Sequence, residues 1–307
     1  AKLHDLTSQP NDGRKLILRL TFTGDLDCHD ARAKDFTATD LKTAMAVTPG
    51  VYAFQPIVMQ VYGTQATGML HIDLASQPEH FALHYSVPQF DVARLFEAMK
   101  LKEMAEGRAD LVADLSFEGH GREDIAHSVT GHLSLKSKEL TLKGYDLDGE
   151  LSRFESTQKF DLLDLGAVFY AGPLGLVATK GYDYAKIKGK AGGKSHIHVL
   201  VAEWQVTQGT ATAEDVAMST DRHRLALQGK VDVKDKAFDG VTVAVVDAQG
   251  CPIAAEQVTG SFKKPKLKKP GVLRTLVGPV RRLADKGKKA LGRPECQVFY
   301  SGSVVPY

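Results

Sequence analysis

The segment from Asp25 to Asp30 gathers aspartate, cysteine and histidine side chains, which are all common metal ligands. A calcium loop of the EF-hand type needs glycine at its sixth position and glutamate at its twelfth. Counted from Asp25, those positions hold Asp30 and Phe36. The segment therefore lacks the calcium pattern, and we expect it to form a solvated turn.

A second candidate metal site is the pair His196 and His198. Side chains two residues apart project from the same face of a strand. Two imidazoles on one face could bind zinc or copper as a pair, but the sequence shows no third ligand nearby. We therefore expect an exposed strand face here, with no metal ion and no other cofactor.

The glycine-rich stretch from Gly189 to Ser195 is similar to a phosphate-binding loop. That motif requires a glycine separated by four residues from its Gly-Lys-Ser end, and a helix after it. Lys188 occupies the required glycine position, and a strand pattern follows, so the stretch is interpreted as a linker. The sequence also contains neither a Gly-x-Ser-x-Gly turn nor a His-Glu-x-x-His helix. We predict that the protein is not an enzyme and has no catalytic residue.

Alternation of apolar and polar residues dominates the chain. Short alternating runs bounded by turns are typical of antiparallel strands that bury one face. The clearest runs are 16–22, 70–74, 81–87, 111–117, 133–135, 197–201, 225–227, 231–233 and 241–245, and turn signals stand at Pro49–Gly50, Gly119–Gly121, Asp148–Gly149 and Asp239–Gly240. The sequence predicts a mainly β fold, in which an elongated antiparallel sheet forms a groove or a sandwich.

Helical signals are few. Val92, Leu95 and Phe96 fit one face of a short helix that begins after Asp91, whose carboxylate can cap it. Another helical turn is expected near residues 125–129. A basic amphipathic helix is expected at residues 272–290, where leucine and valine recur at helical spacing beside many cations.

The composition is that of a folded chain, since 43% of the 307 residues are hydrophobic. The longest uncharged stretch, residues 43–70, is interrupted by Pro49, Gly50 and Pro56, so no membrane-spanning helix is expected. The sequence does not open with a basic segment followed by an apolar one, as a targeting peptide does. We expect it to be part of a longer protein.

The net charge of +2 hides a strong asymmetry. From Lys263 to Arg293 there are twelve lysines and arginines and one acid, Asp285, which leaves −9 on the rest of the chain. A basic block on an acidic body indicates a negatively charged partner such as a membrane surface. The residues expected to contact it are Arg274, Arg281, Arg282, Lys286, Lys288 and Lys289. Nucleic acid is not expected, because the block contains no aromatic residue for stacking on bases.

The three cysteines, Cys28, Cys251 and Cys296, cannot be paired from the sequence alone. In a reducing compartment all three would be free. In an oxidising compartment Cys251 and Cys296 are the favoured couple, because both lie in the C-terminal part of the chain.

Several segments together resemble the C-terminal region of AsmA-family proteins, and the stretch 37–119 has the family's pattern of repeated strands. The segments are Phe160–Leu165, Ala171–Gly175, Thr179–Tyr184, Thr210–Ala217, Phe238–Val243 and Cys296–Val304. The resemblance implies a large envelope protein of diderm bacteria, with an inner-membrane anchor outside this chain and a long periplasmic β-structure. The periplasm is oxidising, which favours the Cys251–Cys296 disulfide.

The resemblance also implies a role in outer-membrane biogenesis and the carriage of phospholipid or another acyl-chain lipid in an apolar β-groove. We expect a groove region at residues 1–185 with short helices, and a C-terminal β unit at 186–307. The candidate groove residues are Leu16, Leu18, Leu20, Phe22, Leu70, Ile72, Leu74, Phe81, Leu83, Tyr85, Leu111, Leu115 and Phe117. The alternative is a structural scaffold that binds envelope assembly proteins without transferring lipid.

The basic block gives a testable prediction. Changing Lys286, Lys288 and Lys289 to Gln should weaken co-sedimentation with anionic liposomes without unfolding the protein. Each lysine close to an anionic bilayer contributes about 1 kcal/mol at most, and less at high salt. If the unchanged protein does not sediment with such liposomes even at low salt, the block is solvated surface.

Overall fold

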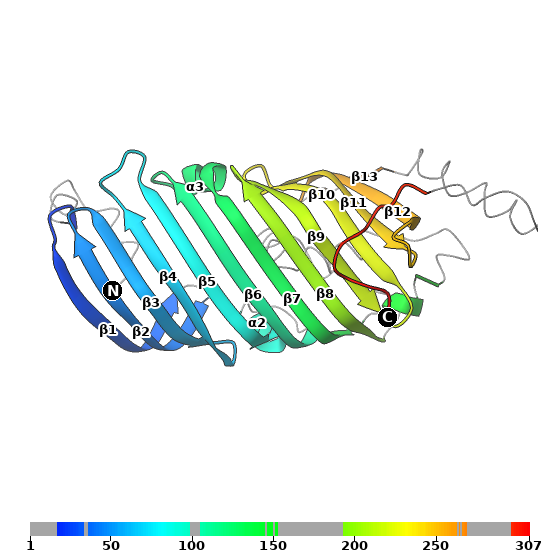
Figure 1. Cartoon of the computed structure of the whole chain (residues 1–307), viewed down its shortest axis with the longest axis horizontal. Coiled ribbons are helices and arrows are strands. Elements are labelled where there is room, and N and C mark those ends of the chain that lie inside the picture. Colours follow the sequence, from blue (N-terminus) through cyan, green and yellow to red (C-terminus); the bar gives the residue numbers. More distant parts are fainter. Residues whose placement is uncertain are drawn as a thin grey trace, which may run out of the picture. The chain divides into compact units, whose positions relative to one another are not determined.

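The computed structural model describes residues 17–33, 36–98, 105–144, 146–149, 151–152, 193–262, 264, 266–268 and 296–307. Within these ranges the protein is mainly β, as the alternation predicts. Thirteen strands hydrogen-bond in the order in which they occur in the chain (Figure 1). They are β1 Phe22–Ala33, β2 Phe36–Thr48, β3 Val51–Val61, β4 Thr64–Asp73, β5 His80–Asp91, β6 Ala105–Glu118, β7 Thr130–Lys143, β8 Lys194–Thr207, β9 Thr210–Thr220, β10 Arg224–Asp232, β11 Ala237–Val246, β12 Pro252–Ser261 and β13 Lys266–Lys268.

The chain divides into two compact units. Unit 1 comprises residues 1–102, 110–133 and 206–209, and unit 2 comprises 103–109, 134–205 and 210–307. The boundary expected at residues 185 and 186 lies outside the described residues, as does the basic helix expected at 272–290.

Unit 1 contains β1 to β5 and two described helices, α2 Val92–Ala98 and α3 Arg122–Ser128. Consecutive strands from β1 to β5 pair antiparallel. The expected cap of the first helix is confirmed, because an Oδ1 atom of Asp91 accepts hydrogen bonds from the backbone N–H groups of Ala93 at 3.0 Å and Arg94 at 3.4 Å.

Two local expectations for unit 1 are wrong. The Asp25–Asp30 segment is not a turn but the middle of β1. Leu18 and Leu20 do not belong to the same strand as Phe22, because β1 begins at Phe22 and the preceding residues form a turn. Pairing with β2 decides the extended conformation of Asp25–Asp30, and this pairing begins only at Phe22. A single segment does not reveal its partner.

Unit 2 buries both faces of its strands over part of their length. Neighbouring strands align Ala217, Ala226, Ala244 and Ala255 in one row. These small side chains share a core cluster with Tyr300 and Val304 of the C-terminal strap, which we define as residues 296–304. On the opposite face Met218, Leu225 and Val245 are aligned and buried.

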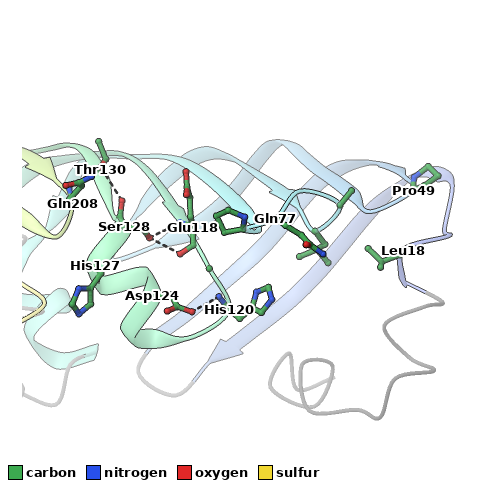
Figure 2. Close-up of a pocket in the computed structure, with 14 residues that line it drawn as sticks. Leu18, Pro49, Gln77, Glu118, His120, Asp124, His127, Ser128, Thr130 and Gln208 are labelled. Carbon is green, nitrogen blue, oxygen red and sulfur yellow. Dashed lines mark hydrogen bonds between the residues drawn. The ribbon is translucent and has the colours of Figure 1, made fainter.

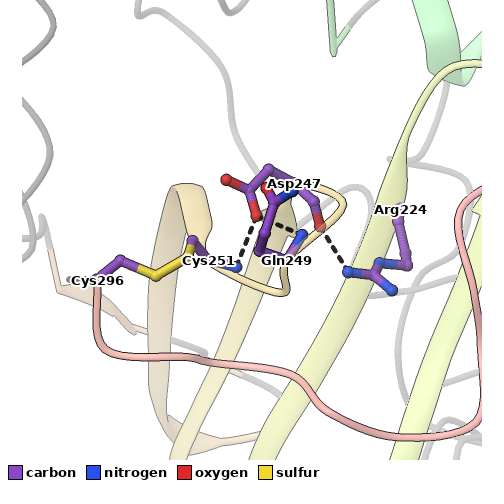
Figure 3. The surroundings of a disulfide bond; sticks show 5 residues. All are labelled: Arg224, Asp247, Gln249, Cys251 and Cys296. Carbon is purple, nitrogen blue, oxygen red and sulfur yellow. Dashed lines mark hydrogen bonds between the residues drawn. A yellow bond between two sulfur atoms is a disulfide. The ribbon is translucent and has the colours of Figure 1, made fainter. Parts of the chain in front are cut away.

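The C-terminal strap is fixed to the turn between β11 and β12. Cys251 and Cys296 form a disulfide with a Cα–Cα distance of 5.9 Å, the pairing expected for an oxidising compartment (Figure 3). The carbonyl oxygen of Gly250 accepts hydrogen bonds from the N–H groups of Phe299 at 2.8 Å and Tyr300 at 3.1 Å. Gly250 has a φ of +82°, and a Cβ there would approach the Tyr300 carbonyl oxygen to 1.9 Å. Only glycine therefore allows this close approach.

The disulfide predicts a definite pattern of thiol reactivity. Alkylation of the denatured, unreduced protein should label Cys28 alone, and alkylation after reduction should label all three cysteines. Mass spectrometry of the intact chain counts the added groups. Three labels on protein secreted into an oxidising compartment would contradict the pairing.

Candidate functional site

One face of the unit 1 sheet is apolar. Register places Phe22, Val47, Tyr52, Ile72 and Phe81 in one row across β1 to β5. The next row is formed by Met45, Phe54, Leu70 and Leu83. Phe117 of β6 stacks on Phe81 with a ring-centroid distance of 5.0 Å. We call these ten residues, together with Tyr85, the apolar face.

The opposite face of the same strands carries polar and small side chains, such as His71 beside Ala53 and Ala82, together with the exposed Met69. His71 lies between Leu70 and Ile72 and is exposed. The ring of His84 contacts the carboxylate of Asp114 on β6. Because side chains alternate along a strand, the sheet of unit 1 is amphipathic.

The side chains of the apolar face are fully buried at one end of the sheet and only half-buried at the other. At the end next to α2, Ala66 of β4 and Val87 of β5 are fully buried, and Phe90 and Phe96 are buried as well. Farther along, Leu70, Ile72, Phe81 and Leu83 are only half-buried, and Phe22 keeps 44% of its surface exposed. Large apolar side chains left half-open in a continuous patch indicate a binding surface.

The structure brings together most of the groove residues expected from the sequence. Phe22, Leu70, Ile72, Phe81, Leu83, Tyr85 and Phe117 belong to the apolar face, and Leu111 and Leu115 are half-buried on β6. Leu74 lies just beyond β4 and Leu18 lies before β1, so neither is a strand residue. Leu16 lies outside the described residues, as do the six expected contact residues of the basic block, Arg274, Arg281, Arg282, Lys286, Lys288 and Lys289. The sequence analysis missed Met45, Tyr52 and Phe54, because their strands lack clean alternation.

A polar group lies on the apolar face. The hydroxyl of Tyr85 is buried and has no hydrogen-bond partner among the described residues. Its burial, and secondarily Tyr62, raises the pKa of Tyr85 far above the usual value, so the phenol stays protonated. A buried, unpaired O–H group costs free energy and can donate to an oxygen of a bound molecule.

Unit 1 also has a polar cavity of about 1160 Å³ at the ends of its strands (Figure 2). Leu18 and Leu74 line it beside Glu118, His120 and Asp124. The backbone N–H of His120 donates to Asp124 at 3.1 Å. The ring of His120 lies 3.0 Å from Glu79. The hydrogen bond between His120 and Asp124 stabilises the turn before α3. The charged side chains in the lining do not suit an acyl chain.

The two histidines of β8 have acidic neighbours that the sequence analysis missed. Glu139 of β7 and Asp221 of the turn after β9 both lie within ion-pair distance of His196 and His198. The expectation of an exposed strand face is wrong for His198, which is buried, and Glu139 is a potential third ligand that only the fold brings near. By contrast, Asp27 and His29 of β1 contact Lys42 and Asp40, respectively, and do not converge on one point.

Charged groups of unit 2 hold the C-terminal strap in place. Asp215 accepts hydrogen bonds from the Tyr300 hydroxyl at 2.5 Å and from the Ser303 hydroxyl and N–H at 2.6 and 2.9 Å. Arg224, which is buried, donates to the carbonyl oxygens of Val304 at 3.0 Å and Asp247 at 2.5 Å. Burial tends to raise the pKa of Asp215, but the hydrogen bonds from Ser303 and Tyr300 outweigh it, and the pKa is lowered overall.

These features define a mainly β protein of sequentially paired antiparallel strands, with one amphipathic stretch of sheet whose apolar face is half-open. A family model described as the AsmA family matches residues 26–216, and the chain belongs to this family. No curated protein and no solved structure matches the chain. The family is associated with the cell envelope, in outer-membrane biogenesis or a lipid-related role. Among the described residues, no helix is long and apolar enough to cross a membrane.

The hydrogen bonds of Asp215 predict a pH-dependent stability of unit 2. Because folding lowers the pKa of this carboxyl, its contribution is present above the unfolded-state pKa of about 3.9 and is lost as the pH falls through the folded-state value. Asp215→Asn should lower the free energy of unfolding at pH 7 by about 2 kcal/mol, the scale of charged hydrogen bonds. The loss should be smaller at pH 3.

Urea titration followed by tryptophan fluorescence measures this effect, since Trp204 is the single tryptophan and is buried in unit 2. Asp239→Asn, at an exposed position of the same unit, is the matched control and should have little effect. An equal loss at pH 7 and pH 3 in Asp215→Asn would contradict the assigned role of the carboxylate.

Proposed function

We propose that the protein is the periplasmic part of an inner-membrane-anchored AsmA-type protein that binds phospholipid, or another acyl-chain lipid, on the apolar face of unit 1. The observation that carries this proposal is the half-open state of that face. A sheet whose only task was to build a core would bury residues such as Leu70 and Phe81 as completely as unit 2 buries Leu225.

The chemistry of the face suits an extended hydrocarbon chain. The apolar face extends across β1 to β6, which is roughly 24 Å at the usual spacing of strands. Each methylene removed from water contributes about 0.8 kcal/mol, so about ten methylenes on the face would contribute roughly 8 kcal/mol before the cost of ordering the lipid. The hydroxyl of Tyr85 could donate a hydrogen bond to a carbonyl oxygen of a lipid ester.

The disulfide and the family support a periplasmic location. Stable disulfides form in oxidising compartments, and the periplasm is one of them. The basic block would serve as a contact with an anionic membrane surface. In this proposal the protein carries out no covalent chemistry, and nucleic acid is not a partner.

Photo-crosslinking tests the proposal at single positions. A photoreactive phenylalanine analogue at Leu70 or Ile72 should crosslink to phospholipid when the protein is irradiated in cells. The same analogue at His71, which points from the opposite face of β4, is the matched control and should not crosslink. Native mass spectrometry of the purified protein should also detect bound lipid.

A charged side chain on the face provides the complementary test. Leu83→Glu should reduce the amount of bound lipid at least about tenfold, because a carboxylate on the face opposes burial of hydrocarbon. Its melting temperature should fall by less than that of Leu225→Glu, because Leu225 is fully buried in unit 2 and Leu83 is not. Equal crosslinking at Leu70 and His71, or crosslinks only to proteins, would support a scaffold role and overturn lipid binding.

A further inference from the structure

Four titratable side chains converge in unit 2, away from the apolar face. They are Glu139 of β7, His196 and His198 of β8, and Asp221 of the turn between β9 and β10. Nε2 of His196 lies 2.7 Å from a carboxylate oxygen of Glu139, and Nδ1 of His198 lies 3.3 Å from the other. One potential ligand atom from each of Glu139, His196 and His198 lies within 4.8 Å of the other two.

The strand and its surroundings fix the orientation of the two imidazoles. His196 and His198 are two residues apart in β8 and lie on the same side, with ring centroids 4.3 Å apart. The His198 ring is stacked on the ring of Tyr307 at a centroid distance of 3.4 Å, and only 7% of its side chain is exposed. An imidazole held in this way can bind an ion without a large loss of rotamer freedom.

Asp221 orients the buried ring. Its Oδ1 atom lies 2.7 Å from Nε2 of His198, the nitrogen on the far side of the ring from Glu139. A histidine that donates one N–H to a carboxylate has its other nitrogen free to bind a metal ion, and metal-binding histidines commonly have such a partner. Asp221 is therefore placed to direct Nδ1 of His198 toward Glu139.

Hydrogen bonding alone does not satisfy this cluster when both rings are neutral. A neutral imidazole offers one donor and one acceptor nitrogen. Both nitrogens of His198 face carboxylate oxygens, so one of them would be an acceptor facing an acceptor. A cation between the acceptor nitrogens and Glu139 removes this conflict, and the two carboxylates together would balance the charge of a divalent ion.

We propose that Glu139, His196 and His198 bind one divalent transition-metal ion of the zinc type, with Asp221 as the positioning residue for His198. Two imidazoles and one carboxylate form a ligand set that suits zinc and other borderline divalent ions better than calcium or magnesium. Tetrahedral zinc has ligands at about 2.0–2.2 Å, so small movements of side chains would complete the geometry. Glu139 has 62% of its side chain exposed, which leaves the ion a route from solvent.

The proposed ion would join elements that are distant in sequence. Glu139 precedes His196 by 57 positions, and the structure brings the two side chains to 2.7 Å. Glu139 also has a φ of 59°, a conformation that costs about 1 kcal/mol or more for a residue other than glycine. Strain of this kind is frequent at ligand-binding positions.

Calorimetric titration of the chelator-treated chain with zinc chloride tests the proposal. We expect one tight site per chain, and no comparable heat with magnesium chloride. His196→Ala and Glu139→Gln should each weaken zinc binding at least about tenfold, and Asp221→Ala should weaken it about tenfold through the orientation of His198. His29→Ala removes an exposed ring that contacts only Asp40 among its described ion pairs, and it should leave the affinity unchanged.

Melting temperature separates loss of the site from loss of the fold. Zinc should raise the melting temperature of the unchanged protein and of His29→Ala, but not that of His196→Ala, while all three should melt alike in EDTA. Unchanged zinc affinity in both His196→Ala and Glu139→Gln would overturn the proposal. Absence of a tight site in the unchanged protein would also overturn it, and would assign the cluster to protonated imidazoles paired with the two acids.

Discussion

The structure depends on the register of its antiparallel strand pairs. Side chains alternate across a sheet with a period of two, so a slip of one residue moves every side chain to the other face. In unit 1 the register that pairs Leu70 with Leu83 and Ile72 with Phe81 also places His71 and His84 on the opposite side. The amphipathic sheet and its apolar face both follow from this one alignment. The register shifts within the β2–β3 and β3–β4 pairs, so the rows of the apolar face are defined on one side of these irregularities.

The sequence predicts the class of fold and much of the apolar face, because alternation is a local property. It does not predict features that require a distant partner. Asp25–Asp30 has the composition of a turn but pairs with β2 as a strand, and Asp239–Gly240 lies within β11, where register shifts opposite Gly229. Glu139 and Asp221 could not be assigned to the histidines of β8, since only the pairing of strands brings them together.

The strands of the two units are arranged in the same way but are covered differently. Unit 2 places a row of alanines under the C-terminal strap and buries larger side chains on the other face, so its strands are covered on both sides over much of their length. Unit 1 leaves large apolar side chains half-buried on one face. On its other face histidine side chains contact acidic ones, as His84 contacts Asp114. The difference lies in what covers each sheet, which the alternation of a single strand does not reveal.

The disulfide gives the strap a kinetic property that its hydrogen bonds alone would not supply. If the strap lifts from the alanine row, its near end remains attached beside Gly250, so its return is an intramolecular step at a high effective concentration. A competing peptide in the surrounding solution would need a comparable concentration to occupy the same row. This stretch of sheet is thus protected from capture by other chains, even during brief openings.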